Sequence, residues 1–425
     1  MDSGMISAEE KEKQDRDRAG RTGALRGKTV LFMGVGLAHY HNPLLNRLQR
    51  ELGVRIVNIV SAKGPGHVLP GVYQTEQGIE FEVVRLPEYT PSVRYHTFRG
   101  LGRVIRMRKP AIIVCTDYYF ATFLFNIPAI LAAGMAGTSL IMKSIPYGVR
   151  TYDERMAELR ARYPGLRMFF SPRALAGLAI LAGCRVLYRR ADAHVVYVDA
   201  GRDIYTSYGV PPAKIFTIYN SPDTDMLLEA AARVRGLPPI LPPCPRRIIH
   251  VGRLVPEKRV DLLLRVARLL SERFTDLELL VVGDGPERSN LERLAQEIGL
   301  GDRARFVGAV HDPETLGRYF RASRVYVLAG RGGLAINDAM CFGKPVVCSV
   351  YEGVEKDLVE EGGNGYIFRP EDEADCAEKV GRILADDGLA ARMGQRSEEI
   401  IRTRMNIHML VGRYAAAFEY VLGSR

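Results

Sequence analysis

Cysteine is scarce in this chain, and none of it is spaced as a metal or disulfide motif. The 425 residues include six cysteines, and no two of them form a C-x-x-C pair: Cys115, Cys184, Cys244, Cys341, Cys348 and Cys376. This spacing argues against a zinc ribbon or a disulfide scaffold and is typical of a reducing compartment. We therefore expect a cytoplasmic protein.

Long apolar segments are also missing. Residues 1–27 are charged and lack an apolar core, so they predict a disordered tail and no secretory signal. The longest uncharged run, residues 118–142, is long enough to span a bilayer. It is interrupted at Gly137-Thr138-Ser139, and we interpret it as a buried helix followed by a short strand over 139–143.

Acidic residues are absent from two basic stretches, 94–109 and 160–190. Residues 1–250 contain 34 Lys/Arg and 21 Asp/Glu, a balance of +13, whereas residues 251–425 contain 25 and 28, a balance of −3. This asymmetry indicates a polyanionic partner, either nucleic acid or an anionic membrane, and a solvated surface is the alternative. Aromatic and aliphatic residues interleave the arginines of 160–190, which suits membrane-interface insertion as well as an interdomain helix. No aromatic stacking platform accompanies them, so nucleic-acid binding is disfavoured.

Short apolar runs alternate with helical patterns along the whole chain, which predicts parallel sheets covered by helices on both faces. Expected strands lie at 28–34, 54–60, 111–116, 139–143 and 193–198, and then at 246–252, 277–283, 304–308, 324–329 and 344–350. Five prolines in residues 237–245 indicate a stiff connector between the two series. We predict an acceptor-side domain over 28–236, the linker 237–245, a donor-side domain over 246–404, and a C-terminal helix over 405–425 that packs back on the first domain.

Ligands of open α/β sheets bind beyond the carboxyl ends of the strands, so the loops there are the candidate sites. Gly252 and the cations Arg253 and Lys258 follow the strand at 246–252 and suit a phosphate or diphosphate. A pair of surface cations is the alternative. Gly283-Asp284-Gly285 forms a turn after the next strand, and Gly330 to Gly333 precedes a helix that carries Asp338.

Four segments together resemble a known family. VGRLVPEKRVDLLL, VVGDGPE, FVGAV and GGLAINDAMCFGKPVV occur in this order, and residues 189–225 extend the likeness towards the linker. They are similar to the retaining glycosyltransferase family 4, which has the GT-B fold. The resemblance implies two Rossmann-like, doubly wound α/β domains that face a cleft.

The resemblance also implies roles for single residues. Arg253 and Lys258 would bind the donor's diphosphate and act in catalysis, and Asp338 would contact the donor ribose. The remaining implied donor-binding positions are Gly252, Gly283, Asp284, Val307, Gly332, Gly333 and Leu334. Fixed cations and amide dipoles would stabilise the leaving diphosphate, so we expect no metal and no other cofactor.

Two positions depart from the family pattern. The family has a pair of glutamates, and here Gly330 stands at the first position and Asp338 at the second. The first glutamate normally approaches the donor sugar, so an inactive nucleotide-sugar-binding protein is an alternative reading. The family's Lys-Gly step is Lys258-Arg259 in this chain.

The first half of the chain offers weaker candidates. Gly34 and Gly36 follow the first strand and could approach donor phosphates, with a plain turn as the alternative. His39 and His41 in the same loop are expected to cap a helix. Asp117 is a candidate acceptor-side catalytic group, and a helix N-cap role is the alternative.

Asp223 and Asp225 match a D-x-D metal site, but they precede a helix and are expected to cap it.

From the family resemblance we predict a glycosyltransferase that moves a sugar, with retention, from a nucleotide-diphosphate sugar to an acceptor hydroxyl. The expected acceptor is a glycan or lipid-linked glycoconjugate of the cell envelope, reached by a cytoplasmic protein peripheral to an anionic membrane. An epimerase on the same fold is the other alternative.

Overall fold

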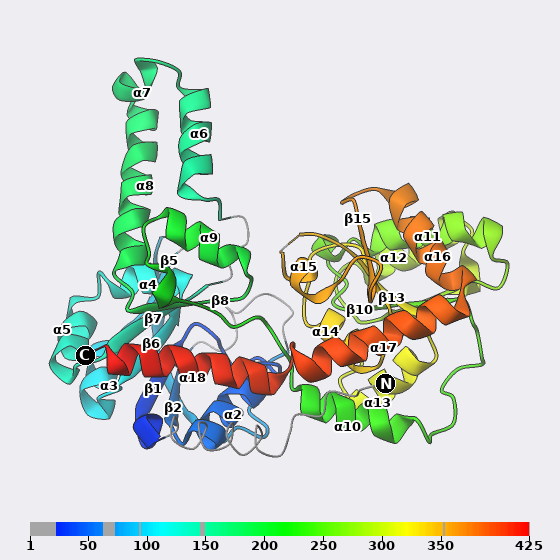
Figure 1. The fold of residues 1–425 in the computed structure, drawn as a ribbon, viewed down its shortest axis with the longest axis horizontal. Helices are drawn as coiled ribbons and strands as arrows, with labels where there is room; N and C mark the ends of the chain where they lie inside the picture. The colour runs from blue at the N-terminus through cyan, green and yellow to red at the C-terminus, as the bar shows by residue number, and fades with distance from the viewer. Residues whose placement is uncertain (1–22, 63–72, 93–94, 145–148, 352, 425) are drawn as a thin grey trace, which may run out of the picture. The chain divides into compact units, whose positions relative to one another are not determined.

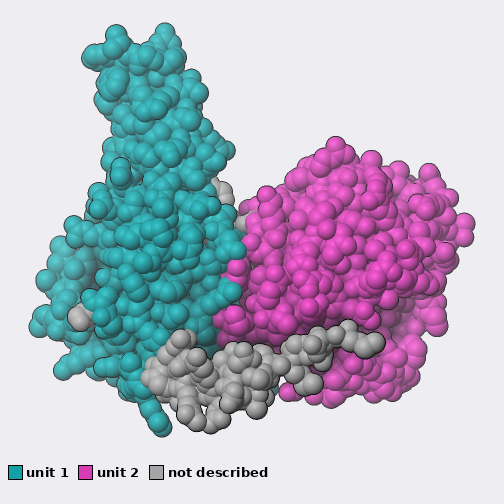
Figure 2. Space-filling view, in the orientation of Figure 1, with its two compact units in different colours: residues 1–218, 411–425 teal, residues 219–410 magenta. Residues whose placement is uncertain are grey.

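The computed structural model describes residues 23–62, 73–92, 95–144, 149–351 and 353–424. The chain divides into two compact units, coloured separately in Figure 2. Unit 1 comprises residues 1–218 and 411–425, and unit 2 comprises residues 219–410. Most of the expected tail over 1–27 falls outside the described residues, which begin at residue 23.

Unit 1 is built on a seven-stranded parallel sheet with the order β3-β2-β1-β6-β7-β8-β9 (Figure 1). Its strands are β1 (Thr29–Met33), β2 (Arg55–Ser61), β3 (Glu82–Leu86), β6 (Ile112–Thr116), β7 (Ser139–Ser144), β8 (Ala193–Val196) and β9 (Ile215–Thr217). A two-stranded antiparallel sheet pairs β4 (Glu88–Ser92) with β5 (Tyr95–Phe98). The helices are α2 (Asn42–Leu52), α3 (Leu101–Arg108), α4 (Asp117–Phe123), α5 (Ile127–Ala136), α6 (Tyr152–Arg162), α7 (Arg167–Phe170), α8 (Pro172–Arg189) and α9 (Ala200–Ser207).

Unit 2 is built on a six-stranded parallel sheet with the order β12-β11-β10-β13-β14-β15. Its strands are β10 (Arg247–Val251), β11 (Glu278–Val282), β12 (Ala304–Gly308), β13 (Val325–Leu328), β14 (Val346–Ser349) and β15 (Gly365–Phe368). Its helices are α10 (Thr224–Val234), α11 (Val260–Arg273), α12 (Arg288–Glu297), α13 (Pro313–Arg321), α14 (Ala335–Cys341), α15 (Val354–Leu358), α16 (Glu373–Ala385) and α17 (Asp387–Thr403). The last helix, α18 (Ile407–Gly423), begins in unit 2 and continues in unit 1.

The two doubly wound parallel sheets confirm the predicted fold class. Each unit has its own apolar core, because strands buried on both faces carry near-continuous runs of Val, Ile and Leu. The ten expected strands all form, with ends that shift by one or two residues. The strands β3, β9 and β15 were not expected; they are three to five residues long, and most of their side chains are only partly buried.

The division between the units differs from the expected boundary at 237–245. Unit 2 begins at Tyr219, so α10 belongs to it and not to the first domain. The physical reason is burial, because the apolar face of α10 packs against α13 and α14. Residues 411–425 group with unit 1, where the Ser139 hydroxyl donates to the carbonyl oxygen of Val421 at 3.2 Å.

The proline-rich segment 237–245 is fixed to unit 2 by arginines. A proline residue has a backbone carbonyl acceptor but no N–H donor. Donors on neighbouring side chains must therefore supply the hydrogen bonds to the carbonyls of this segment. Arg321 donates to the carbonyl of Leu237 at 2.7 Å, and Arg324 donates to that of Pro245 at 3.1 Å. The segment contains no helix or strand, and these contacts hold it along α13.

The uncharged run over 118–142 forms α4, α5 and β7, so the expected single buried helix is wrong. The alanines on one face of α5 are buried, whereas Phe125, Leu131 and Met135 are exposed. Within the described chain no single helix is long and apolar enough to cross a bilayer; α4 and α5 pass that test only as a pair bent by 91°.

Candidate functional site

Three loops of unit 2 meet at the carboxyl edge of its sheet. The first, Gly252–Lys258, follows β10; the second, Gly283–Gly285, follows β11; the third, Gly330–Gly333, follows β13. The strands β11, β10 and β13 are neighbours, and all are parallel. Their carboxyl ends therefore place most of the predicted donor-binding residues side by side.

Close backbone contacts join the first two loops. The amide of Leu254 donates to the carbonyl of Asp284 at 2.9 Å, and the amide of Gly252 donates to that of Val282 at 3.0 Å. A Cβ atom on Gly283 would lie 1.8 Å from the carbonyl oxygen of Gly252, and φ at Gly283 is 152°. A side chain at this position would overlap the first loop, so the turn requires glycine.

Lys258 joins the first loop to the third. Its Nζ donates to the carbonyl oxygens of Arg331 at 2.8 Å and Gly332 at 2.9 Å. The amide of Arg331 donates in turn to the carbonyl of Glu257 at 2.7 Å. A Cβ atom on Gly333 would lie 3.4 Å from the same Nζ. The predicted diphosphate residues Lys258, Gly332 and Gly333 therefore lie together.

Gly330 has a steric reason to lack a side chain. A Cβ atom there would lie 2.2 Å from the carbonyl oxygen of Glu257 and 2.6 Å from the carbonyl carbon of Lys258. The backbone of the first loop thus occupies the space into which a side chain at position 330 would extend. The absence of a side chain at Gly330 thus allows the backbone of the Lys258 loop to approach the third loop closely.

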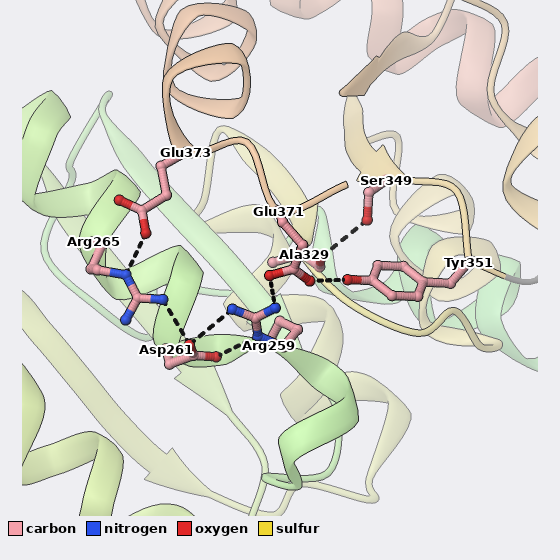
Figure 3. Close-up of polar contacts among 8 residues, drawn as sticks. All are labelled: Arg259, Asp261, Arg265, Ala329, Ser349, Tyr351, Glu371 and Glu373. Atoms are coloured by element: carbon pink, nitrogen blue, oxygen red, sulfur yellow. Dashed lines mark hydrogen bonds and ion pairs between the residues drawn. The ribbon is translucent and has the colours of Figure 1, made fainter. Parts of the chain in front are cut away.

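Arg259 explains the other departure from the family pattern (Figure 3). Its backbone is left-handed, with φ 50° and ψ 40°, a conformation that glycine adopts freely and that costs other residues about 1–2 kcal/mol. Asp261 accepts two hydrogen bonds from its guanidinium, at 3.1 and 3.2 Å, and Glu371 accepts another. Tyr351 donates to Glu371 at 2.5 Å. These ion pairs hold Arg259, and with it the end of the Lys258 loop.

The remaining predicted donor-side residues surround these loops. Arg253 is half-buried in the first loop, and Leu334 is the N-cap residue of α14. The carboxylate of Asp284 accepts from the amide of Gly285 at 2.8 Å. Val307 lies at a bulge of β12, between Phe306 and Gly308, which pair with Val281 and Val282. The amide of Gly283 donates to the carbonyl of Gly308 at 2.8 Å, so this bulge adjoins the second loop.

His250 is a buried residue of this region that sequence reasoning missed. Its Nδ1 lies 3.1 Å from the carbonyl oxygen of Val327, and its Nε2 is buried and has no hydrogen-bond partner in the described structure. Burial lowers its pKa to about 4, so the ring is neutral. A Cβ atom on Gly252 would lie 3.2 Å from Nε2, which places the ring under the first loop. The sequence feature that could have revealed His250 is its position as a polar residue within the apolar strand expected at 246–252.

Asp338, on α14, has an unusual carboxyl group. The side chain is half-buried, and its removal from water raises its pKa from 3.8 to about 7. The group can therefore donate a hydrogen bond as an acid or accept one as a carboxylate near neutral pH.

We expect Asp338 to make the stability of unit 2 depend on pH. The unfolded chain releases this proton near pH 4 and the folded chain near pH 7, so the free energy of unfolding falls as pH rises between these values. Asp338→Asn removes the titrating carboxyl group and with it this pH dependence of the free energy of unfolding. The melting temperature of the variant should rise relative to that of the parent between about pH 5 and about pH 8. Asp302→Asn, a control at an exposed position, should show the same pH dependence of the melting temperature as the parent. Parallel melting curves for parent and Asp338→Asn would contradict the assignment.

The candidates of unit 1 lie at the carboxyl edge of its own sheet. Gly34 has φ 85°, and a Cβ atom there would lie 2.4 Å from Oγ1 of Thr116, so this turn makes a close packing contact. Gly36 has φ 60°, and its carbonyl accepts from Asn58 at 2.7 Å. Asp117 is the first residue of α4, one position after the N-cap Thr116, so the expected N-cap position was wrong by one. Burial raises the pKa of Asp117 to about 6.

The sequence suggested that His41 caps a helix. Its side chain makes no capping hydrogen bond to α2. Its Nε2 lies 2.7 Å from Nζ of Lys143 at the end of β7, and both side chains are buried. Burial lowers the pKa of Lys143 to about 7, and burial together with the lysine charge lowers the pKa of His41. These residues are 102 positions apart, so no local pattern could reveal the contact.

The two acids of the D-x-D motif have separate structural roles. Asp223 is the N-cap of α10 and accepts from the amide of Met226 at 3.4 Å, as expected. Asp225 lies in the first turn of α10, and its Oδ2 lies 2.9 Å from Nε2 of His408, so the expectation that it caps the helix was wrong. In the part of the chain that the structure describes, no three His, Cys, Asp or Glu side chains form a metal-binding group.

Comparisons with known proteins identify both halves of the chain. Residues 36–221 match the family described as "Glycosyl transferase 4-like domain", and residues 241–400 match "Glycosyl transferases group 1". Alpha-D-kanosaminyltransferase of Streptomyces kanamyceticus is 31% identical over 35% of this chain and 39% of its own length. D-inositol 3-phosphate glycosyltransferase of Corynebacterium urealyticum is 30% identical over 51% of this chain and 52% of its own length. The matched part of the chain thus spans about half or less of the length of these relatives.

Solved structures resemble this chain in fold over most of its length. HepE of Anabaena, solved in complex with UDP, superposes with a TM-score of 0.65 at 16% identity, covering 91% of this chain and 98% of HepE. Sucrose-phosphate synthase of Thermosynechococcus elongatus gives a TM-score of 0.64 at 19% identity, covering 94% and 100%. At such identities the likeness shows the fold. The chain therefore has the GT-B fold, and its two halves are similar to the glycosyl transferase 4-like domain (residues 36–221) and to glycosyl transferases group 1 (residues 241–400).

Proposed function

We propose that this protein transfers a sugar from a nucleotide-diphosphate sugar to an acceptor hydroxyl, with retention of the anomeric configuration. The observation that carries the proposal is the contact of Lys258 with the third loop, because it fixes a cation beside Gly332 and Gly333. The match to the glycosyltransferase group 1 family over residues 241–400 covers all three loops. HepE, which has the same fold, was solved with UDP, a nucleoside diphosphate.

In the proposed reaction the bond between the sugar C1 and the donor diphosphate breaks, and its electron pair leaves with the diphosphate. The acceptor oxygen bonds to C1, and its proton is released to the leaving diphosphate. Lys258, Arg253 and the amides of Gly332 and Gly333 would stabilise the growing negative charge. Groups held in place before the reaction need no reorganisation, which makes them effective at this task.

We propose that the acceptor is a glycan or a lipid-linked glycoconjugate of the cell envelope and that the protein works at the cytoplasmic face of a membrane. The charge balance of +13 in residues 1–250 against −3 in residues 251–425 supports this. One relative is named poly(ribitol-phosphate) alpha-N-acetylglucosaminyltransferase of Staphylococcus aureus, and one structural neighbour is a lipopolysaccharide outer core galactosyltransferase.

Radiolabelled nucleotide sugars incubated with the protein and a membrane extract test the proposal. We expect label to enter a glycoconjugate, and the anomeric configuration of the product, measured by NMR, to equal that of the donor. Binding without turnover would indicate the inactive alternative, and a change of the donor sugar without transfer would indicate an epimerase.

We also expect transfer to survive EDTA. Fixed cations and amides would supply the charge stabilisation that a divalent ion provides in D-x-D enzymes. The rate after EDTA treatment and desalting should equal the rate before it. Loss of activity that magnesium restores in the parent, but not in Asp223→Asn, would contradict metal independence.

A further inference from the structure

A helical hairpin projects from unit 1. Figure 1 shows α6 and α8 running side by side away from the sheet, with α7 at the far end, and Figure 2 shows the same projection in space-filling form. A Cβ atom on Gly177 of α8 would lie 2.7 Å from Leu159 Cδ1 of α6, so the two helices pack closely. The hairpin is therefore a built element and not a loose loop.

Aromatic contacts anchor the base of the hairpin to the body of unit 1. The ring of Tyr188 near the end of α8 packs edge-on against Tyr205 and Tyr208, with centroids 5.0 and 5.1 Å apart. At the start of α6 the amide of Tyr152 donates to the Ser207 hydroxyl at 2.8 Å. The tip is thus held at a fixed distance from the sheet.

The tip exposes large apolar side chains. Leu166 is 74% exposed, Phe169 is 62% exposed and Phe170 is 78% exposed. Clustered exposed aromatic residues on a projecting element mark an interaction surface, because water contact with them is unfavourable. These residues lie within a single turn of α7 and the residue before it.

Four arginines surround the tip: Arg160, Arg162, Arg167 and Arg173. All four are exposed, and none forms an ion pair with another described residue. Arginines of unit 2 such as Arg265 and Arg396, in contrast, pair with carboxylates. The stretch 160–190 contains no acidic residue. Because these four arginines are exposed and form no ion pair with a carboxylate of the described residues, the tip suits an anionic partner.

We propose that the tip of this hairpin, residues 160–173, inserts its apolar side chains into an anionic lipid bilayer while its arginines contact the headgroups. Aromatic and aliphatic residues flanked by arginines match the layered polarity of a membrane interface. The proposal names the surface through which the proposed transferase reaches a membrane. It does not depend on catalysis, since vesicle binding is measured without substrate.

Fluorescence provides a direct test, because the chain contains no tryptophan. Phe169→Trp introduces a single reporter at the tip. With vesicles of phosphatidylglycerol and phosphatidylcholine its emission should shift to shorter wavelength, and with phosphatidylcholine alone it should not. Unchanged emission with anionic vesicles would overturn the proposal.

Co-sedimentation with the same vesicles identifies the surface that binds. Arg162→Glu/Arg167→Glu/Arg173→Glu and Phe169→Ser/Phe170→Ser should each lower vesicle affinity at least tenfold. Leu131→Ser/Met135→Ser on α5, where large apolar side chains are also exposed, is the matched control and should bind like the parent. Thermal melting identifies variants that fail to fold.

The opposite outcomes each contradict the proposal. If the hairpin variants sediment with vesicles like the parent, the tip is a solvated surface that does not bind membranes. If only the α5 variant loses vesicle binding, α5 is the membrane-binding surface. A parent that is oligomeric by light scattering and becomes monomeric on Phe169→Ser/Phe170→Ser would assign the tip to a second copy of the chain. Binding should also weaken at 1 M salt, where the screening length is only about 3 Å.

Discussion

Replacing Lys258 by alanine is expected to lower kcat/KM for sugar transfer by about 10²–10³-fold, the usual cost of removing one fixed donor to a developing anion. The same change removes the contacts of Nζ with the carbonyls of Arg331 and Gly332. It should therefore also loosen the third loop. Steady-state kinetics with the donor that the parent uses measures the effect.

Two controls separate charge from structure in this experiment. Arg293→Ala removes a surface cation of α12 that pairs only weakly with Glu297, and it should keep parental kinetics. Arg253→Ala should lose activity to a similar extent as Lys258→Ala, and thermal melting shows whether the variant is folded. Near-parental turnover in a folded Lys258→Ala protein would remove Lys258 from the site.

Gly330→Glu is the second change with a large expected effect, and it introduces the residue that the family resemblance implies for this position. Because a Cβ atom there would lie 2.2 Å from the carbonyl oxygen of Glu257, we expect the Lys258 loop to be displaced. Overpacking of this kind costs about 1–3 kcal/mol of stability, and misplacement of a catalytic cation costs about 10²-fold in rate. Melting temperature and turnover should both fall.

Gly236→Ala is the matched control, since a Cβ atom at this exposed position of unit 2 would have no neighbouring atom within 4 Å. It should melt and turn over like the parent. Higher turnover in Gly330→Glu would contradict our account of this position and would indicate that the missing glutamate limits activity.

The sequence predicted the fold well where strands are long, apolar and buried. The segment ARFVG at 304–308 forms β12 with the predicted ends, and the strand at 28–34 forms β1. Short strands such as β15, of four residues, gave too weak a periodic signal. The domain boundary was misplaced because α10 is assigned by its packing on α13 and α14, which proline content does not report.

The sequence indicated which loops to examine for a site, but it did not indicate the contacts between those loops. Glycines and cations at strand ends indicated which loops to examine, because parallel strands bring their carboxyl ends to one edge. Arg259, which has a left-handed backbone, forms an ion pair with Glu371, 112 residues away, and no local pattern encodes that ion pair. The contact of His41 with Lys143 and the exposure of α5 likewise depend on tertiary packing.

If the three loops of unit 2 hold the diphosphate of a nucleotide sugar, calorimetric titration will detect the binding of a nucleoside diphosphate. UDP, GDP, ADP and dTDP would be titrated into the parent, Lys258→Ala and Arg293→Ala in the presence of EDTA. We predict that at least one diphosphate binds the parent and Arg293→Ala equally, and that its affinity for folded Lys258→Ala is at least tenfold lower. Equal affinity for all three proteins, or no binding of any diphosphate by the parent, would contradict the account.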